Sequence, residues 1–159
     1  MQEQNTQNLA ENLIKVRESL RLVAYKDTAG VPTIGYGATT IDGRKVTMLD
    51  TCTIAQALMW LRNRIDEDYK KLELFCNMHD INLEDNQAAA ILSFTYNAGF
   101  KAFMNSSMGK DLILGRIDNV SSDLMKWDKI RVDGELTYSP GLFNRRMQES
   151  QCFINEKSC

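Results

Sequence analysis

Histidine is nearly absent from this sequence, which contains only His79 in 159 residues. Zinc sites are commonly built on histidine pairs, and a cysteine nucleophile needs a histidine base with an orienting partner. A single histidine is too few for either kind of site. His79 itself lies in the polar stretch 77–82, which favours a solvated loop position. We expect no metal and no cofactor.

The sequence has no CxxC pair and no other metal-ligand spacing among its four cysteines, which are Cys52, Cys76, Cys152 and Cys159. A chain of this length buries enough surface to fold without disulfides, so we interpret all four as free thiols. The sequence leaves open whether the two C-terminal cysteines pair outside a reducing compartment.

No hydrophobic run approaches the length of a membrane span, so we expect no stable membrane insertion. The polar start 1–8 has no basic residue followed by an apolar core and is unlike a secretory signal. The formal net charge of −2 gives no basic footprint, which argues against nucleic acid as a partner. The composition, 43% hydrophobic and 25% charged, is that of a globular domain.

A stripe at helical spacing predicts a first helix over residues 6–19; its members are Leu9, Leu13, Val16 and Leu20. Strands are predicted at 21–26 and 31–36, around a turn at 28–30, with Pro32 indicating an edge strand. The Asp42-Gly43 pair predicts another hairpin turn, before a strand at 44–47.

The register of the first hairpin follows from its turn. If residues 28–30 form a three-residue loop, Asp27 pairs with Val31 and Tyr25 pairs with Thr33. Asp27 and Thr33 then share one face as diagonal neighbours, with Cβ atoms about 7 Å apart and room for a water between their oxygens. A loop one residue longer would change this register.

Two carboxyls and a hydroxyl therefore gather near the junction of helix and hairpin: Glu18, Asp27 and Thr33. A hydrolase needs such groups to protonate a leaving group and to position a water. On spacing alone, these residues are equally consistent with an ordinary polar surface.

A Thr53-x-x-Gln56 capping box opens a helical pattern of about 25 residues whose centre, 62–71, is highly charged. Such a helix either bridges two lobes across solvent or lies on the surface. Residues 83–97 are largely apolar and predict a buried central helix stopped by Gly99. Shorter helices are predicted at about 106–114, 119–127 and 142–155, with Pro140 and Gly141 breaking the chain before the last.

With these features together, the sequence resembles the phage-type lysozymes, the endolysins of glycoside hydrolase family 24. The pattern Glu18-x8-Asp27-x5-Thr33 matches the family's catalytic spacing, and the surrounding block 18–37 is more specific. Further family blocks keep their order and lie at 87–99, 102–107, Trp127 and 141–146. The resemblance extends from about residue 9 to residue 153.

The resemblance implies an α+β, lysozyme-like fold, mostly helical, in a single domain over residues 1–159. A small β-hairpin lobe is expected at about 20–52 and a larger helical lobe at 79–159. A long helix at 53–78 would join them, with the active-site cleft between the lobes. Helix 6–19 is expected to pack on the helical lobe.

The resemblance also implies the reaction. The substrate would be the glycan strands of peptidoglycan, cleaved at the β-1,4 bond between N-acetylmuramic acid and N-acetylglucosamine by single-displacement inversion. Glu18 would protonate the departing oxygen, and Asp27 would hold the water with Thr33. Arg145 matches the family's arginine partner of the acid, with Arg146 taking that role if the register is off by one.

Asn97 and Gly35 are the candidate substrate contacts. Asn97 lies where the family presents a polar side chain to the cleft, or else it closes the buried helix. Gly35 and Gly37 either let a sugar approach the strand or permit a bend. Ala38 departs from the family, in which a histidine usually follows the Gly-Tyr-Gly block, and this departure bears on lobe packing more than on catalysis.

The expected life cycle follows from the same resemblance. A monomer would accumulate in the host cytoplasm until a holin opens the membrane, and would then act on the cell wall and lyse the host.

One alternative function is that of a lytic transglycosylase, which uses no water and leaves a 1,6-anhydro sugar. Another is an inactive glycan-binding protein. The presence of Asp27 and Thr33 argues against the first, and the intact set with Glu18 argues against the second.

Overall fold

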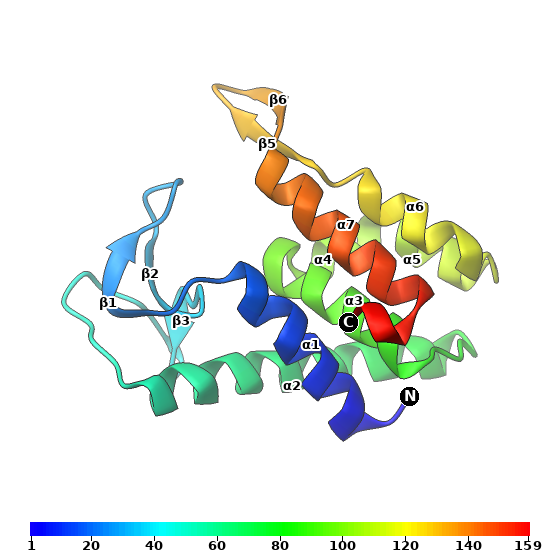
Figure 1. Cartoon of the computed structure of the whole chain (residues 1–159), viewed down its shortest axis with the longest axis horizontal. Coiled ribbons are helices and arrows are strands. Elements are labelled where there is room, and N and C mark those ends of the chain that lie inside the picture. Colours follow the sequence, from blue (N-terminus) through cyan, green and yellow to red (C-terminus); the bar gives the residue numbers. More distant parts are fainter.

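The computed structural model describes all residues from Met1 to Cys159 and shows a mostly helical α+β fold (Figure 1). The longer helices are α1 (Glu3–Arg17), α2 (Ile54–Met78), α3 (Asp85–Ala98) and α7 (Pro140–Ile154). The short ones are α4 (Phe100–Asn105), α5 (Ser107–Ile113), α6 (Val120–Met125) and the 3-10 turns η1 (Ile117–Asn119) and η2 (Glu156–Ser158). None of the helices has both the length and the apolar character needed to cross a bilayer.

The strands form three separate antiparallel hairpins. They are β1 (Arg21–Lys26) with β2 (Pro32–Gly35), β3 (Thr40–Ile41) with β4 (Arg44–Lys45), and β5 (Lys129–Val132) with β6 (Glu135–Tyr138). The first two hairpins lie together at one end of the molecule, away from most of the helices (Figure 1).

Buried hydrophobic side chains form two clusters, which explains why the first two hairpins lie apart from most of the helices. The larger cluster has 23 residues and fills the space among the helices. The smaller one joins the strands to the start of α2 and consists of Ala24, Ile34, Ile41, Val46 and Trp60.

Helix α2 contributes to both clusters and confirms the predicted bridging helix. Its capping box is complete: the Thr53 hydroxyl accepts a hydrogen bond from the Gln56 N–H at 3.1 Å, and the Gln56 side chain accepts one from the Thr53 N–H at 2.9 Å. Trp60, near the start of α2, packs among the strands, whereas Leu61 and Leu72 pack in the helical cluster.

Helix α3 is the predicted central helix, with eight consecutive buried residues over 88–95. Its three successive alanines let α1, α2 and α7 approach it closely. Gly99 ends the helix with φ 91° and donates its N–H to the Thr95 carbonyl at 2.8 Å. The C-terminal end of α3 is thereby left at the edge of the helical cluster.

The buried face of helix α1 matches the predicted stripe only in part, because Leu9 and Leu13 pack on the helical cluster but Val16 does not. Its buried residues are Thr6, Ala10, Leu13 and Ile14. Val16 is 67% exposed, so the predicted stripe is wrong at this position. The small side chains of Thr6 and Ala10 allow close packing on α3. A stripe defined by large apolar residues does not include such positions. The Glu18 N–H donates to the Ile14 carbonyl at 2.9 Å and ends the helix.

The β1–β2 hairpin has the predicted register. The Asp27 N–H donates to the Val31 carbonyl at 3.0 Å, and Tyr25 lies opposite Thr33. The loop is therefore the three-residue one. Because β2 pairs only with β1, Pro32 lies on an edge strand, as predicted.

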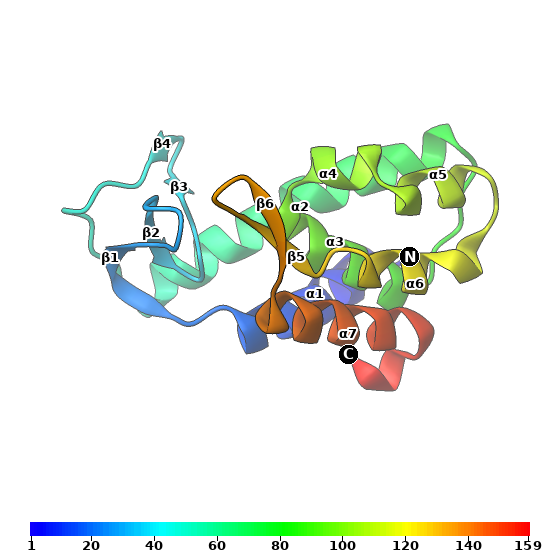
Figure 2. The same ribbon diagram turned by 90° about the horizontal axis from the view of Figure 1, so that it is seen from above.

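The β5–β6 hairpin is not predicted from the sequence, which indicates only short helices in this part of the chain. Asp133 and Gly134 form the turn, the same Asp-Gly signal that marks β3–β4. Every residue of both strands is exposed, and the hairpin projects beyond the helices from the start of α7 (Figure 1). Figure 2 shows its turn directed toward the end of the molecule that holds β1–β4.

Helix α7 begins earlier than predicted. Pro140 and Gly141 do not break the chain but form the first turn of the helix. The Ser139 hydroxyl accepts a hydrogen bond from the Leu142 N–H at 3.3 Å, and a proline at the first helical position loses no intrahelical hydrogen bond.

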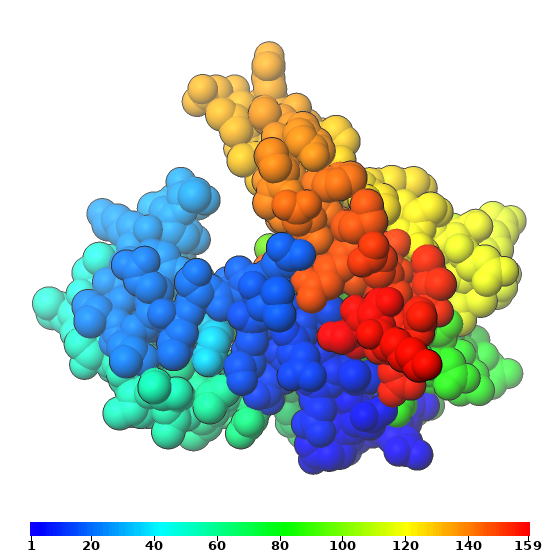
Figure 3. All heavy atoms as spheres, viewed as in Figure 1, coloured from blue at the N-terminus to red at the C-terminus, as the bar shows by residue number.

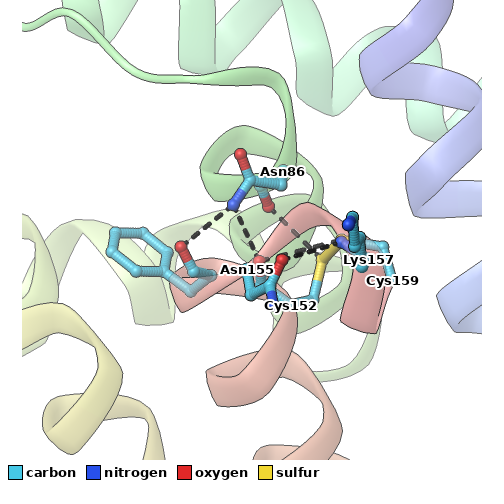
Figure 4. Close-up of a disulfide and its surroundings, with 6 residues drawn as sticks. Asn86, Cys152, Asn155, Lys157 and Cys159 are labelled. Atoms are coloured by element: carbon cyan, nitrogen blue, oxygen red, sulfur yellow. Dashed lines mark hydrogen bonds between the residues drawn. A yellow bond between two sulfur atoms is a disulfide. The ribbon is translucent and has the colours of Figure 1, made fainter.

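The interpretation of four free thiols is wrong for two of them, because Cys152 and Cys159 form a disulfide (Figure 4). The chain turns back after α7, through η2, and brings the two Cα atoms to 4.6 Å. Asn86 of α3 holds the same turn, since its side-chain amide donates to the carbonyls of Cys152 at 2.8 Å and Phe153 at 3.1 Å. Cys52 and Cys76 are free.

We predict that thiol titration with a disulfide-forming reagent at pH 8 detects only Cys52 in the folded, oxidised protein. Cys76 is buried, and burial raises the pKa of its thiol to about 11, so it is both inaccessible and protonated. Denaturation should expose Cys76 as the second of the two free thiols. Four thiols in denatured, unreduced protein purified under oxidising conditions would contradict the disulfide.

Candidate active site

A cavity of about 700 Å³ lies between the strands, the middle of α2 and the C-terminal end of α3. Its polar lining includes Glu18, Tyr25, Asp27, Thr33, Tyr96 and Asn97. Figure 3 shows the surface hollowed between the β1–β2 hairpin and the β5–β6 hairpin. The three predicted catalytic residues therefore reach one cleft.

Glu18 lies at the point where α1 ends and the chain becomes extended. Its side chain is 22% exposed, and its Oε1 accepts a hydrogen bond from Arg145 Nη1 at 2.8 Å. The arginine comes from α7, 127 residues later, and its side chain is only 7% exposed. A nearly buried guanidinium thus holds a partly exposed carboxyl at the cleft wall.

The turn of the hairpin holds Asp27 rigidly. Its Oδ1 accepts hydrogen bonds from the backbone N–H groups of Ala29 and Val31, both at 2.9 Å. The Thr33 hydroxyl, 3% exposed as a residue, donates to the Val31 carbonyl at 2.8 Å. Both side chains are therefore oriented, with Asp27 Oδ2 and the lone pairs of Thr33 left to accept hydrogen bonds from a third group.

Behind Glu18 lies a buried charge network centred on Glu149 of α7, which is 1% exposed. Arg145 Nε lies 3.4 Å from Glu149 Oε1, and Arg146 Nε lies 2.8 Å from Glu149 Oε2. The Ser93 hydroxyl of α3 donates to Glu149 Oε1 at 2.8 Å. Burial raises the pKa of the Glu149 carboxyl, and the positive charges of Arg146 and Arg145 act in the opposite direction.

Arg146 contacts a different cleft residue from the one that Arg145 contacts. Its Nη2 donates to Asn97 Oδ1 at 2.9 Å, while its guanidinium lies over the ring of Phe94 with a distance of 4.8 Å to the ring centroid. The two adjacent arginines thus point to two different cleft residues, Glu18 and Asn97.

Comparison with known proteins identifies this arrangement. Residues 15–149 match the family described as phage lysozyme. The chain belongs to the phage lysozyme family. The match spans Glu18, the β1–β2 hairpin, α2, α3 and the two arginines, and this member of the family is a glycoside hydrolase of the lysozyme type.

Individual relatives agree with this assignment. The endolysin of Acyrthosiphon pisum secondary endosymbiont phage 1 is 38% identical over 142 residues, which cover 89% of this chain and 92% of that protein. The endolysin of Salmonella phage P22 is 30% identical, again with coverage of 89% and 92%. Among solved structures, the endolysin of Escherichia coli O157:H7 phage FAHEc1 aligns with a TM-score of 0.81 and 30% identity over 98% of this chain and 95% of that one. The lysozyme-like fold class is therefore confirmed.

The structure corrects the candidate glycan contact at Gly35 of this phage lysozyme. Gly35 is buried and does not line the cleft. A Cβ atom built on it would point at α2, 3.3 Å from the Cβ of Ala57. The absent side chain allows the strand to pack on α2, and it is Gly37, not Gly35, that lines the cleft.

Several residues that line the cleft of the lysozyme are not predicted from the sequence. Tyr25 lies on β1, two residues before Asp27, which directly follows the strand, so the period of two already puts both on one face. Tyr96 donates its hydroxyl to the Tyr36 carbonyl and joins α3 to the strands, and burial raises the pKa of that hydroxyl. Asn63, Arg64 and Glu67 line the cleft from the charged centre of α2, so the cleft explains part of the polarity of that segment.

Ala38 lines the cleft at the position where the resemblance leads us to expect histidine. Its N–H donates to the Ile34 carbonyl at 2.8 Å and its carbonyl accepts from the Ile34 N–H at 2.9 Å. This pair of hydrogen bonds closes the Gly35-Tyr36-Gly37 turn through the backbone, so the turn does not depend on a histidine side chain.

We predict that Arg145→Ala lowers the free energy of unfolding by about 3 kcal/mol, because it removes one partner from a buried ion-pair network. Activity should fall as well, since Glu18 loses the group that holds it. Urea denaturation and peptidoglycan turbidity assays measure the two effects. Arg62→Ala is the control, because it removes an exposed 2.8 Å ion pair with Glu11 and should change stability little. Unchanged melting with full activity in Arg145→Ala would contradict its assignment.

Proposed function

We propose that this chain is an endolysin whose Glu18, Asp27 and Thr33 hydrolyse the β-1,4 bond between N-acetylmuramic acid and N-acetylglucosamine by single-displacement inversion. The observation that carries the proposal is that these three side chains line one cleft from two elements, α1 and the β1–β2 hairpin. Inverting glycosidases need an acid on the leaving oxygen and a base that activates a water from the other face of the sugar ring.

Glu18 is the general acid in this proposal. The acid must carry a proton and point at the glycosidic oxygen, whereas a neighbouring guanidinium favours the ionised carboxylate. Arg145 contacts Glu149 as well as Glu18, so two carboxyl groups share its positive charge. The arginine then orients the acid, because its guanidinium holds Glu18 Oε1 at 2.8 Å.

Asp27 and Thr33 hold the nucleophilic water. Because the Thr33 hydroxyl already donates its hydrogen to the Val31 carbonyl, it can only accept a hydrogen bond from the water. Asp27 Oδ1 is engaged by the turn, so Oδ2 accepts the second hydrogen and takes the proton as the water attacks. The water then directs a lone pair at the anomeric carbon, and the Asp27 charge stabilises positive charge that develops there.

Asn97 is the proposed glycan contact from the helical side of the cleft. Arg146 donates to Asn97 Oδ1 and so fixes which way the amide points. The Nδ2 group is left to donate a hydrogen bond to a sugar hydroxyl or acetamido oxygen. We therefore favour a binding role for this side chain over helix closure, which the backbone at Gly99 provides.

Release and location complete the proposal. The monomer accumulates in the host cytoplasm and reaches the cell wall when a holin opens the membrane. Cytoplasmic thiols stay reduced, so the bond between Cys152 and Cys159 forms after release. Expression without a holin should leave host cells intact until chloroform permeabilises them; prompt lysis without either would argue against this route.

The deciding measurement of the reaction is digestion of purified peptidoglycan, with mass spectrometry of the new ends. Hydrolysis yields reducing muramic acid, whereas 1,6-anhydro ends would indicate a transglycosylase and no cleavage would indicate a glycan binder. Proton NMR of early products should show the α anomer if the β bond is cleaved with inversion.

We predict that Glu18→Gln lowers turnover at least about 100-fold, because the amide cannot protonate the leaving oxygen. The control is Glu73→Gln, which changes an exposed carboxyl on α2 away from the cleft and should leave turnover unchanged. Undiminished turnover of Glu18→Gln would exclude Glu18 as the acid.

A further inference from the structure

The Glu18 carboxylate is confined on two sides. Arg145 holds Oε1 at 2.8 Å, and Gly37 lies against Oε2. A Cβ atom built on Gly37 would be 2.8 Å from Oε2 and 3.1 Å from the carboxyl carbon of Glu18. Nonbonded carbon and oxygen atoms do not approach this closely without repulsion. The observed position of Glu18 is therefore compatible only with glycine at position 37.

We propose that Gly37 is a positioning residue for the general acid. Its missing side chain provides the space in which the Glu18 carboxylate lies while it is bound to Arg145. This inference rests on the proposed function, because it gives Gly37 a role in the reaction assigned to Glu18.

The backbone conformation alone does not account for this glycine. Gly37 has φ +77°, a conformation that glycine tolerates best, but other glycines of the chain share it. Gly115, with φ +71°, has no atom within 4 Å of a built Cβ. Of the nine glycines, Gly37 alone has a carboxylate in the space of its missing side chain.

The consequence of adding a side chain is specific to the acid. The carboxylate is the far end of a flexible side chain, so it moves before the backbone does, and the fold loses little beyond the cost of the φ angle. Glu18 would then leave Arg145 and the glycosidic oxygen. A displacement of about 1 Å is enough to lower a rate by about 100-fold.

The test compares Gly37→Ala with Gly115→Ala, which imposes the same kind of backbone strain at an exposed turn outside the cleft. Both variants should melt lower than wild type by about 2–8 °C. On soluble glycan strands, Gly37→Ala should lose about 100-fold in kcat with KM changed less than about twofold, whereas Gly115→Ala should keep its kcat. Wild-type kcat in Gly37→Ala would overturn the proposal.

A double mutant separates positioning from a general structural role. In the Glu18→Gln background the acid is already absent, so adding Gly37→Ala should lower the residual rate little further. If the two losses multiply instead, Gly37 acts independently of Glu18 and the inference is wrong.

A crystal structure of Gly37→Ala provides a readout that does not depend on activity. We expect the Glu18 carboxylate to lie more than about 3.5 Å from Arg145 Nη1, beyond hydrogen-bond distance. An unchanged ion pair would overturn the role of Gly37. Failure of the wild type to cleave peptidoglycan would instead overturn the proposed function, and the two failures are thereby distinguished.

Discussion

A single buried carboxylate, Glu149, determines how the helical part of this lysozyme is joined to its active site. An isolated charge in such a position costs several kcal/mol, so its two arginines and the Ser93 hydroxyl are required by its burial. Each arginine has further donors, and one set reaches Glu18 while the other reaches Asn97. The packing of α7 on α3 therefore fixes the positions of two cleft side chains.

This arrangement lets residues far apart in sequence act in one site. Glu18 ends the first helix, whereas Arg145 lies in the last one. Because α1 and α7 both pack against α3, the proposed acid and its arginine partner are both carried by helices of the larger cluster. Asp27 and Thr33 lie in the β1–β2 hairpin, which contributes Ala24 and Ile34 to the smaller cluster, and the backbone of the hairpin holds both side chains. The proposed acid and the proposed water site thus have separate supports, which meet at the cleft.

The sequence predicts best those structural features that nearby residues alone determine. The Thr53–Gln56 capping box and the three-residue loop after Asp27 are set by nearby residues, and the structure has both. It predicts less well where the outcome depends on distant partners. The choice of Arg145 over Arg146 as partner of Glu18 depends on the rotation of α7 against α1, since successive residues on a helix point about 100° apart.

The predictions that the structure contradicts also fail for physical reasons. Val16 is exposed because α3 packs on the small residues of α1 and not on its largest ones. Gly35 and Gly37 share a strand-like parity, yet the chain turns between them, so one faces α2 and the other faces Glu18. The pairing of Cys152 with Cys159 depends on how the chain bends after α7, which no residue spacing specifies.

The β5–β6 hairpin offers a different kind of consequence. Its base is closed by a hydrogen bond from the Ser139 N–H to the Asp128 carbonyl at 2.8 Å, and its ten residues contribute nothing to either hydrophobic cluster. Segments whose ends are fixed and whose interior is exposed tolerate insertion and replacement. This is the place where the chain can change in length, or accept a foreign peptide, without requiring the rest of the protein to repack.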